Sequence, residues 1–264
     1  MFFGKWNLFP MELNQKLFDC MAPNAEGVVV DQVTLGLGYT AVTTVQGDVG
    51  IAATGVAMDA CCAGSLDVVD YEGRPAIDLL QQILIDDPMT RTMALALINA
   101  LNHRQVQDLP EDADNRVLFD RFGILSGARV AMVGYFPPLV RFLESRNVPL
   151  TIVDDAKGVG DKPAFYDRLA DWAEALLITA TSIINNTTET ILSHAGPGVK
   201  TILLGPSTPM LPEAFTHLPV HMLAGTAITD PEKALKIVRH GGGARTLKPA
   251  SRKVYRLTEL GRSI

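Results

Sequence analysis

The chain has 264 residues, of which 47% are hydrophobic and 20% charged, and its formal net charge is −6. This composition excludes an intrinsically disordered protein and supplies apolar material for one large core or two modest ones. No segment approaches the roughly 18 consecutive apolar residues of a membrane span, and residues 1–10 lack the apolar stretch of a signal peptide. We therefore expect a cytoplasmic protein without a membrane partner.

The helices and strands expected near the N-terminus form a small α+β unit. Residues 33–54 alternate apolar with small or polar side chains and turn at residues 46–48, which indicates a hairpin or short meander. Helices are expected at residues 75–85 and 88–101, because each stretch begins with a proline, a residue suited to the first helical position.

A domain boundary is expected in the polar, acid-rich residues 103–115, with one domain over residues 1–110 and a second over residues 111–264. In the second domain, apolar strands alternate five times with helical stretches, as in a parallel sheet that is buried on both faces. The expected strands are residues 129–133, 150–153, 175–179, 201–204 and 220–224, and the expected helices are residues 139–146, 164–172, 187–194, 211–216 and 231–240. The predicted fold class is α/β, a doubly wound Rossmann-like sheet with a smaller N-terminal α+β domain.

Positive charge is concentrated at the end of this pattern. Residues 233–264 contain nine lysines or arginines and one acidic residue, whereas the remainder has 14 basic and 28 acidic residues. Such a segment can line an anion site or an interface, and it can also be a solvated helix followed by a terminal strand. No aromatic or glycine pattern of a nucleic-acid-binding module accompanies it, so we expect no nucleic-acid partner.

Small, hydroxyl or amide residues follow all five expected strands of the second domain. In an open parallel sheet the ligand lies beyond the carboxyl ends of the strands, where these residues would meet. Hydroxyls, amides and free backbone N–H groups suit a carboxylate or a phosphate, although such residues are also ordinary helix caps. The candidate ligand-binding residues are Gly134, Phe136, Pro137, Asp154, Asp155, Thr179, Thr181, Asn185, Thr187, Gly205, Pro206, Ser207, Thr208 and Gly225.

The same residues lack the diagnostic spacings of several well-known sites. A dinucleotide site needs a G-x-G-x-x-G turn, and only Gly134 of its three glycines is present. Asp154 lies at the position of the acidic residue that binds the ribose in such sites, so an adenosine-containing ligand stays an alternative. The histidines and cysteines have no diagnostic metal spacing; the adjacent Cys61 and Cys62 fit a soft metal ion or, more commonly, buried thiols. No G-x-S-x-G elbow occurs, so no catalytic residue is assigned and enzymatic activity is left open.

The strand-end loops also carry a family resemblance. Gly134-Tyr135-Phe136-Pro137, the Thr and Asn run of residues 179–187 and Gly205-Pro206-Ser207-Thr208 together resemble the family named for heavy-metal chelation. The resemblance implies an enolase N-terminal-like domain, here with Tyr39 and Thr40, followed by a Rossmann-like domain. It further implies a ligand site between the two domains, formed by these residues, and an acidic residue before the third strand, for which Glu174 is a candidate.

The residues and the resemblance support three hypotheses. The leading one is a small-ligand binding protein or enzyme whose inter-domain site takes an anionic metabolite or a metal chelate. The second is a protein that handles a transition metal directly through Cys61, Cys62, histidines or the aspartates. The third is a nucleotide- or S-adenosylmethionine-dependent enzyme. Homo-oligomerisation is left open.

Overall fold

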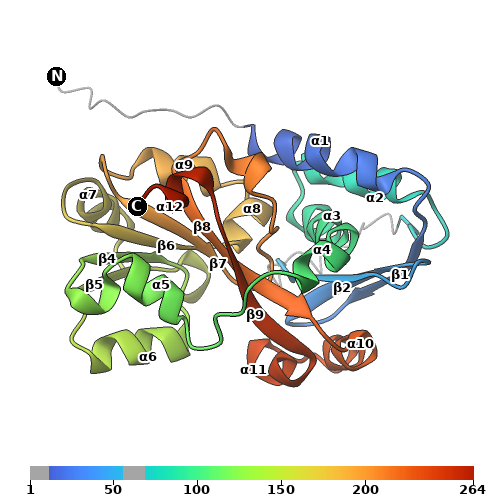
Figure 1. The fold of residues 1–264 in the computed structure, drawn as a ribbon. Coiled ribbons are helices and arrows are strands. Elements are labelled where there is room, and N and C mark those ends of the chain that lie inside the picture. Colours follow the sequence, from blue (N-terminus) through green and yellow to red (C-terminus); the bar gives the residue numbers. More distant parts are fainter. Residues whose placement is uncertain (1–11, 56–68) are drawn as a thin grey trace.

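The computed structural model of the protein describes residues 12–55 and 69–264 and contains two sheets (Figure 1). The smaller sheet has the order β1-β2-β3, and the larger has the order β5-β4-β6-β7-β8-β9. Cys61 and Cys62 lie outside the described residues. Within the described ranges, none of the helices combines the length and the apolar character that crossing a membrane requires.

The smaller sheet confirms the predicted meander. Strands β1 (Val30–Leu35), β2 (Tyr39–Thr44) and β3 (Val49–Ala53) pair antiparallel in chain order. Helix α3 (Pro88–Leu101) has the predicted limits and packs on one face of this sheet, where Gly50 allows close approach; a Cβ on Gly50 would lie 2.1 Å from the backbone N of Ala100. The other helices of this half are α1 (Leu13–Ala25), α2 (Ala76–Leu80), the 3₁₀ helix η2 (Gln81–Leu84) and α4 (His103–Gln107).

Two of these helices were not expected from the sequence. Helix α1 buries Leu13, Leu17 and Met21 at helical spacing, although Pro23 stands inside it. Helix α4 occupies the first part of the polar stretch, where Val106 is its one buried side chain. Short helices with few buried residues give weak periodicity, so the sequence pattern did not reveal α4.

The larger sheet confirms the doubly wound α/β fold. Its five expected strands run parallel, and a sixth, β9, pairs antiparallel with β8. The expected helix at residues 211–216 is instead a short 3₁₀ helix. The strands are β4 (Val130–Val133), β5 (Leu150–Val153), β6 (Ala175–Thr179), β7 (Lys200–Leu204), β8 (Val220–Ile228) and β9 (Ser251–Leu257). The α-helices are α5 (Arg116–Arg121), α6 (Pro137–Ser145), α7 (Lys162–Asp171), α8 (Thr181–Ile184), α9 (Thr188–Ser193), α10 (Pro231–Arg239), α11 (Ala244–Leu247) and α12 (Glu259–Arg262). The 3₁₀ helices are η3 (Ile124–Ser126), η4 (Asp155–Lys157), η5 (Pro212–Phe215) and η6 (Lys248–Ala250).

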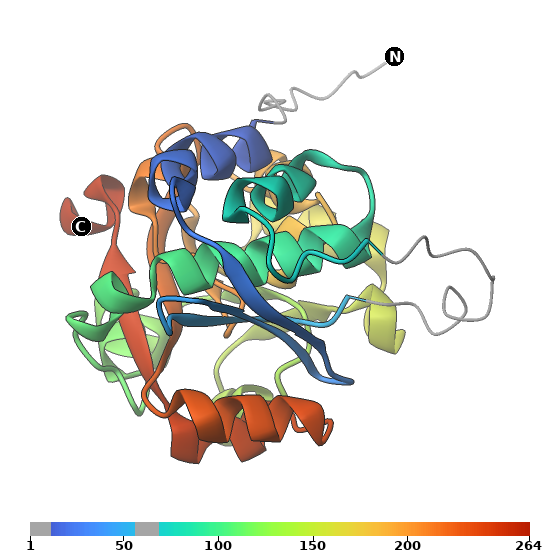
Figure 2. The same ribbon diagram turned by 90° about the vertical axis from the view of Figure 1, so that its right-hand side faces the viewer.

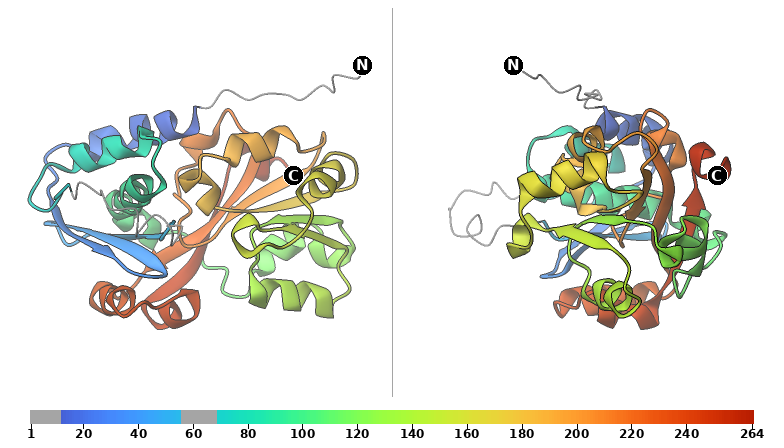
Figure 3. Two further views of the ribbon diagram at one scale, coloured as in Figure 1. Left: turned by 180° about the vertical axis from the view of Figure 1, so that it is seen from behind. Right: turned by 90° about the vertical axis from the view of Figure 1, so that its left-hand side faces the viewer.

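Alternating strand residues build a core on each face of the larger sheet. On β6, Ala175 and Leu177 face the cluster formed with α5 and α6, whereas Leu176 and Ile178 face α7 and α9. The hydrophobic cluster on the α7 and α9 side also includes buried residues of α1, α2 and α3. The two halves of the molecule therefore share one hydrophobic core, and Figure 3 shows them lying side by side.

The C-terminal half also covers the outer face of the smaller sheet. Ala234 and Val238 of α10 pack against Tyr39, Ala41 and Ile51. Figure 2 shows α10 running along the side of this sheet opposite α3. The smaller sheet thus lies between a helix of its own half and a helix from the far end of the chain.

Candidate functional site

The strand order of the larger sheet reverses between β4 and β6. The chain moves from β4 outward to β5 and then returns to pair β6 with the opposite side of β4. In doubly wound sheets the ligand lies at this reversal, beyond the carboxyl ends of the two strands. The residues that follow β4 and β6 are therefore the first candidates for a ligand site.

Gly134 and two threonines meet at this reversal. Gly134 follows β4 with φ +93°, and a Cβ at this position would lie 2.9 Å from Cβ of Thr179, the last residue of β6. The Oγ1 atoms of Thr179 and Thr181 are 2.9 Å apart, and both threonines are half-buried. The missing side chain of Gly134 lets the loop after β4 lie directly against the Cβ and Cγ2 atoms of Thr179.

Asp154 holds the loop after β4 in place. Its Oδ2 accepts a hydrogen bond from the backbone N–H of Tyr135 at 2.7 Å and one from Nζ of Lys157 at 3.1 Å. Lys157 also donates to the carbonyl oxygen of Tyr135 at 2.8 Å. Asp155, by contrast, forms an ion pair with Lys162 at 2.6 Å on the surface. Of the two aspartates, Asp154 is the one directed toward the strand-end loops.

The loop after β7 joins the two halves. Ser207 is buried, and its Oγ accepts from the backbone N–H of Ala53 at 2.7 Å. Nδ2 of Asn99 donates to the carbonyl oxygens of Ile51 at 2.9 Å and of Ser207 at 3.4 Å. Thr208 Oγ1 donates to the carbonyl oxygen of Ala224 at 3.1 Å. These contacts give Ser207 and Thr208 structural partners inside the protein.

The end of β3 runs across the carboxyl ends of the larger sheet. After Ala53 meets Ser207, the backbone N–H of Gly55 lies 3.4 Å from Oγ1 of Thr92, and a Cβ on Gly55 would lie 2.8 Å from Cγ2 of Ile184 in α8. Residues 53–55 therefore span from the β7 loop to α8 and cover the strand ends from the side of the smaller sheet.

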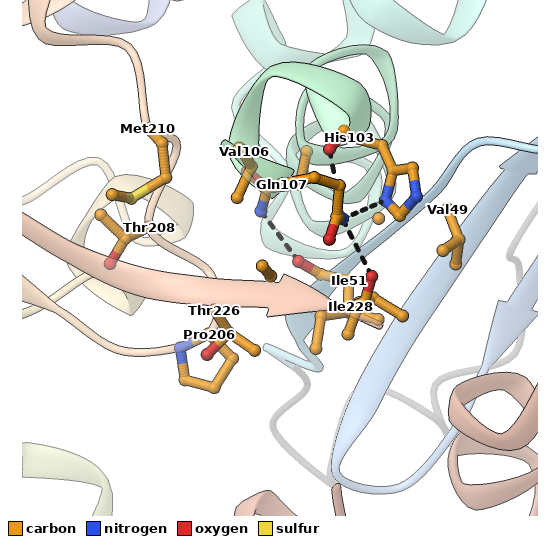
Figure 4. Close-up of a pocket in the computed structure, with 13 residues that line it drawn as sticks. Val49, Ile51, His103, Val106, Gln107, Pro206, Thr208, Met210, Thr226 and Ile228 are labelled. Atoms are coloured by element: carbon orange, nitrogen blue, oxygen red, sulfur yellow. Dashed lines mark hydrogen bonds between the residues drawn. The ribbon is translucent and has the colours of Figure 1, made fainter. Parts of the chain in front are cut away.

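A small cavity lies beside the β7 loop, between the two halves (Figure 4). Its volume is about 20 Å³, which is room for about one water molecule. Its lining includes Pro206 and Thr208 of the candidate set together with His103 and Gln107 of α4. Burial lowers the pKa of His103, and Nε2 of Gln107 donates to the carbonyl oxygen of Ile228 at 3.0 Å. Because α4 was not expected, the sequence pattern could not place these two side chains at the junction.

The remaining candidate residues are dispersed around the junction. Tyr39 is 6% exposed and faces α10, and burial raises its pKa to about 12. The neighbouring Thr40 points to the other face, where its Oγ1 lies 3.2 Å from Oγ1 of Thr54. Asn185 and Thr187 are exposed at the corner between α8 and α9. Phe136 is the N-cap residue of α6, and Pro137 is the first residue of that helix. Gly205 follows β7 with φ +120°, and Gly225 packs against Met210.

Glu174 and the metal-ligating side chains do not form a cluster at the strand-end loops in the described residues. Glu174 lies at the amino end of β6, where it accepts from the backbone N–H of Arg129 and pairs with its guanidinium, so it is remote from the strand-end loops. In residues 12–55 and 69–264 no three His, Cys, Asp or Glu side chains gather in a way that could hold a metal ion. The buried Glu189 lies beside the half-buried His217, with Oε1 and Nε2 3.3 Å apart.

These features define a doubly wound α/β protein with a small antiparallel sheet whose last strand ends beside the loop after β7 and α8. Comparison with family models matches residues 117–257 to DUF364 and residues 18–102 to DUF4213, both described as "Putative heavy-metal chelation". The chain belongs to this family.

The chain is also similar to individual proteins. The chain is 29% identical over 178 residues to an uncharacterized protein of Methanocaldococcus jannaschii, an alignment that spans 63% of this chain and 66% of the relative. Two solved DUF364 proteins of unknown function share the fold. That of Pyrococcus horikoshii has a TM-score of 0.76 and 19% identity, covering 93% of this chain and 100% of its own. That of Desulfitobacterium hafniense has a TM-score of 0.70 and 20% identity, covering 92% and 99%.

Proposed function

We propose that the protein binds a small metal chelate at the reversal between β4 and β6, beneath residues 53–55. The observation that carries the proposal is the pair of hydroxyls of Thr179 and Thr181, 2.9 Å apart, at the point where Gly134 brings the loop after β4 against Thr179. It is the position at which doubly wound sheets hold their ligands, and both threonines are partly open to solvent.

The chemistry of these side chains suits the organic shell of a chelate. Threonine hydroxyls donate to carboxylate oxygens and also accept, so they can bind a chelator whose own atoms coordinate the metal. Phe136 adds an apolar contact, since its Cε2 atom lies 3.4 Å from the position that a Cβ on Gly134 would take. The family description supplies the link to heavy metals.

The helix ends nearest the reversal offer few donors to a phosphate group. Phosphates bind at helix N-termini through free backbone N–H groups. Helix α6 begins with Pro137 and Pro138, which have no N–H, and the start of α7 is capped by the carboxylate of Asp161, which accepts from Ala164 N at 2.8 Å. A nucleotide would therefore find few donors at the nearest long helices.

Thermal unfolding in the presence of chelates tests the proposal. Nickel, cobalt and zinc are each added as the chloride, as the citrate complex and as the EDTA complex. Citrate alone, EDTA alone, ATP, NAD and S-adenosylmethionine are tested in parallel. We expect a chelate to stabilise the protein, by about 2.7 kcal/mol at a hundred times its dissociation constant. Stabilisation by the free ions alone would support direct metal binding, and stabilisation by adenosine compounds alone would support a nucleotide site; either result contradicts the proposal.

A matched pair of variants locates the site. Thr181→Val removes one hydroxyl at the reversal at nearly constant volume, and Thr229→Val makes the same change at an exposed position after β8. We expect the first to weaken binding of the stabilising chelate about tenfold, which is the loss of one hydrogen bond of about 1.4 kcal/mol, and the second to leave it unchanged. Equal affinity in both variants would place the ligand elsewhere.

A further inference from the structure

Eight of the nine basic residues in 233–264, all except Arg262, fall into two structural groups. Three of them, all on β9, donate to other parts of the protein: Arg252 to the carbonyl oxygens of Leu109 and Gln107, Arg256 to the carbonyl oxygen of Met210, and Lys253 to Oδ1 of Asn115. These contacts fix β9 to the segment after α4 and to the loop after β7, so they have a structural purpose.

Five other cations of this region are exposed on α10 and the segment that follows it. No ion pair or side-chain hydrogen bond within the described part of the chain involves their charged groups. We call them the α10 basic patch, which consists of Lys233, Lys236, Arg239, Arg245 and Lys248. An unpaired group of like charges repels itself, and an oppositely charged partner relieves this repulsion.

Helix α10 orients three of these cations in one direction. Ala234 and Val238 are buried against the smaller sheet, and Lys233, Lys236 and Arg239 follow one another at three-residue spacing on the side turned to solvent. The stripe is therefore accessible to a partner, and none of its three charged groups takes part in an ion pair within the described residues.

A surface groove of about 510 Å³ runs along this stripe. It is lined by the three cations with Leu235, and by Gln32 of β1 on its opposite side. The acidic residues Asp230 and Glu232 lie at the end where α10 begins, and Asp230 is occupied there as the helix cap, accepting from Lys233 N at 3.0 Å. A ligand with negative charges would therefore lie toward the Lys236 and Arg239 end.

The C-terminal end of α10 adds an apolar contact to this surface. Leu37, at the turn between β1 and β2, is 90% exposed, and a Cβ on Gly241 would lie 3.1 Å from its Cδ1. Leu35 beside it is also exposed. A partner that follows the stripe to its end would meet these two leucines.

We propose that the α10 basic patch is the docking surface for an acidic segment of a partner protein, with glutamate or aspartate side chains on Lys233, Lys236 and Arg239 and an apolar residue on Leu37. A polypeptide fits these features because it can combine carboxylates with an apolar anchor. Single-stranded nucleic acid is less well matched, since it is held by stacking on aromatic side chains, and the exposed large hydrophobic residues in the described ranges are all aliphatic.

Fluorescence anisotropy with a labelled decaglutamate peptide tests the proposal on the full-length protein. At about 20 mM salt we expect saturable binding, which weakens about tenfold or more at about 200 mM salt because exposed charges are screened. The variant K233Q/K236Q/R239Q should bind about tenfold more weakly. The control R116Q/R141Q/R146Q removes the same charge from exposed positions of α5, α6 and the turn after α6, and should change the affinity less than twofold.

Four outcomes would overturn the proposal. They are absence of decaglutamate binding at low salt, an equal loss in the control variant, tighter binding of a labelled deca-thymidine strand, and tighter binding to vesicles of phosphatidylserine and phosphatidylcholine. Sedimentation at low salt adds a further check. Self-association that the triple α10 variant abolishes would identify a second copy of this chain as the occupant and would likewise contradict a separate acidic partner.

Discussion

The backbone N–H of Ala53 donates to Oγ of Ser207 at 2.7 Å, although the two residues are 154 positions apart. Ala53 ends the smaller sheet, and Ser207 lies in the loop after β7 of the larger sheet. This hydrogen bond thus connects the two sheets next to the strand ends at which we place the ligand. Its partners suggest how the junction can be tested.

Ser207→Ala should destabilise the protein by roughly 1–3 kcal/mol, because it leaves the N–H of Ala53 without its acceptor in a largely buried place. Urea unfolding measures this change. Ser145→Ala is the control, since that exposed hydroxyl on α6 donates only to the carbonyl oxygen of Phe142. A Ser207→Ala protein that unfolds at the wild-type midpoint would show that the bond does not hold the halves together.

Glu189→Ala should detach the first turn of α1. The buried carboxylate accepts from the backbone N–H groups of Glu12 and Leu13 at 2.6 and 2.9 Å and lies beside His217. Hydrogen bonds to a charged group contribute roughly 1.5–3 kcal/mol each, so a loss of at least about 2 kcal/mol is expected. Hydrogen exchange should become faster in the first turn of α1, whereas the exposed Glu213→Ala should leave this exchange unaltered.

Gly134→Ala should be more damaging than Gly127→Ala. Both glycines have positive φ, +93° and +102°, so alanine is strained at either position by roughly 1–2 kcal/mol. Only at Gly134 would the new Cβ also meet a neighbour, at 2.9 Å from Thr179, whereas nothing lies within 4 Å at Gly127. Unfolding free energies should differ by about 1 kcal/mol or more, the cost of overpacking. Equal losses would show that the β4 loop is not pressed against Thr179.

His221 should make the protein less stable in mild acid. Burial, followed by the charge of Lys200, lowers its pKa below the ordinary value of 6.5, and its Nδ1 accepts from Thr201 N at 3.0 Å. Below pH 6.5 the unfolded chain binds a proton that the folded protein does not, so this stability is present above pH 6.5 and is lost as the pH falls below it.

Urea unfolding between about pH 7.5 and about pH 5.5 checks this sign. His221→Gln should give a shallower fall in unfolding free energy over that range than the wild-type protein. The control is His240→Gln, at an exposed position after α10, which should keep the wild-type slope. A steeper slope in His221→Gln would mean that the imidazole is stabilised in its charged form.

Much of the larger sheet could be predicted because its strands are continuous apolar runs with clear ends. Strands β5 and β6 have the limits that the sequence predicted, and helix α3 begins at its proline. The polar residues after each strand predicted that the ligand site lies at the carboxyl ends of the strands. The division into domains at residues 110 and 111 stays a prediction, while the structure shows that both halves contribute to one core.

The candidate site could be predicted only in part. Sequence reasoning named Gly134, Thr179 and Thr181 together, and in the structure Thr179 contacts both of the others. It also grouped Tyr39 with Thr40, which as neighbours on a strand must face opposite sides of the sheet. It could not distinguish Ser207, which is buried against Ala53, from the half-buried Thr181, since both are hydroxyl residues after a strand.

The sequence by itself determined the kinds of element and their order, because apolar periodicity, prolines and glycines act over a few residues. Only the tertiary structure decided where the strand order reverses, that Asp154 rather than Asp155 holds the β4 loop, and that α10 covers a sheet nearly 200 residues earlier in the chain. These are contacts between distant segments. They depend on how whole faces pack together, and a local pattern does not contain that information.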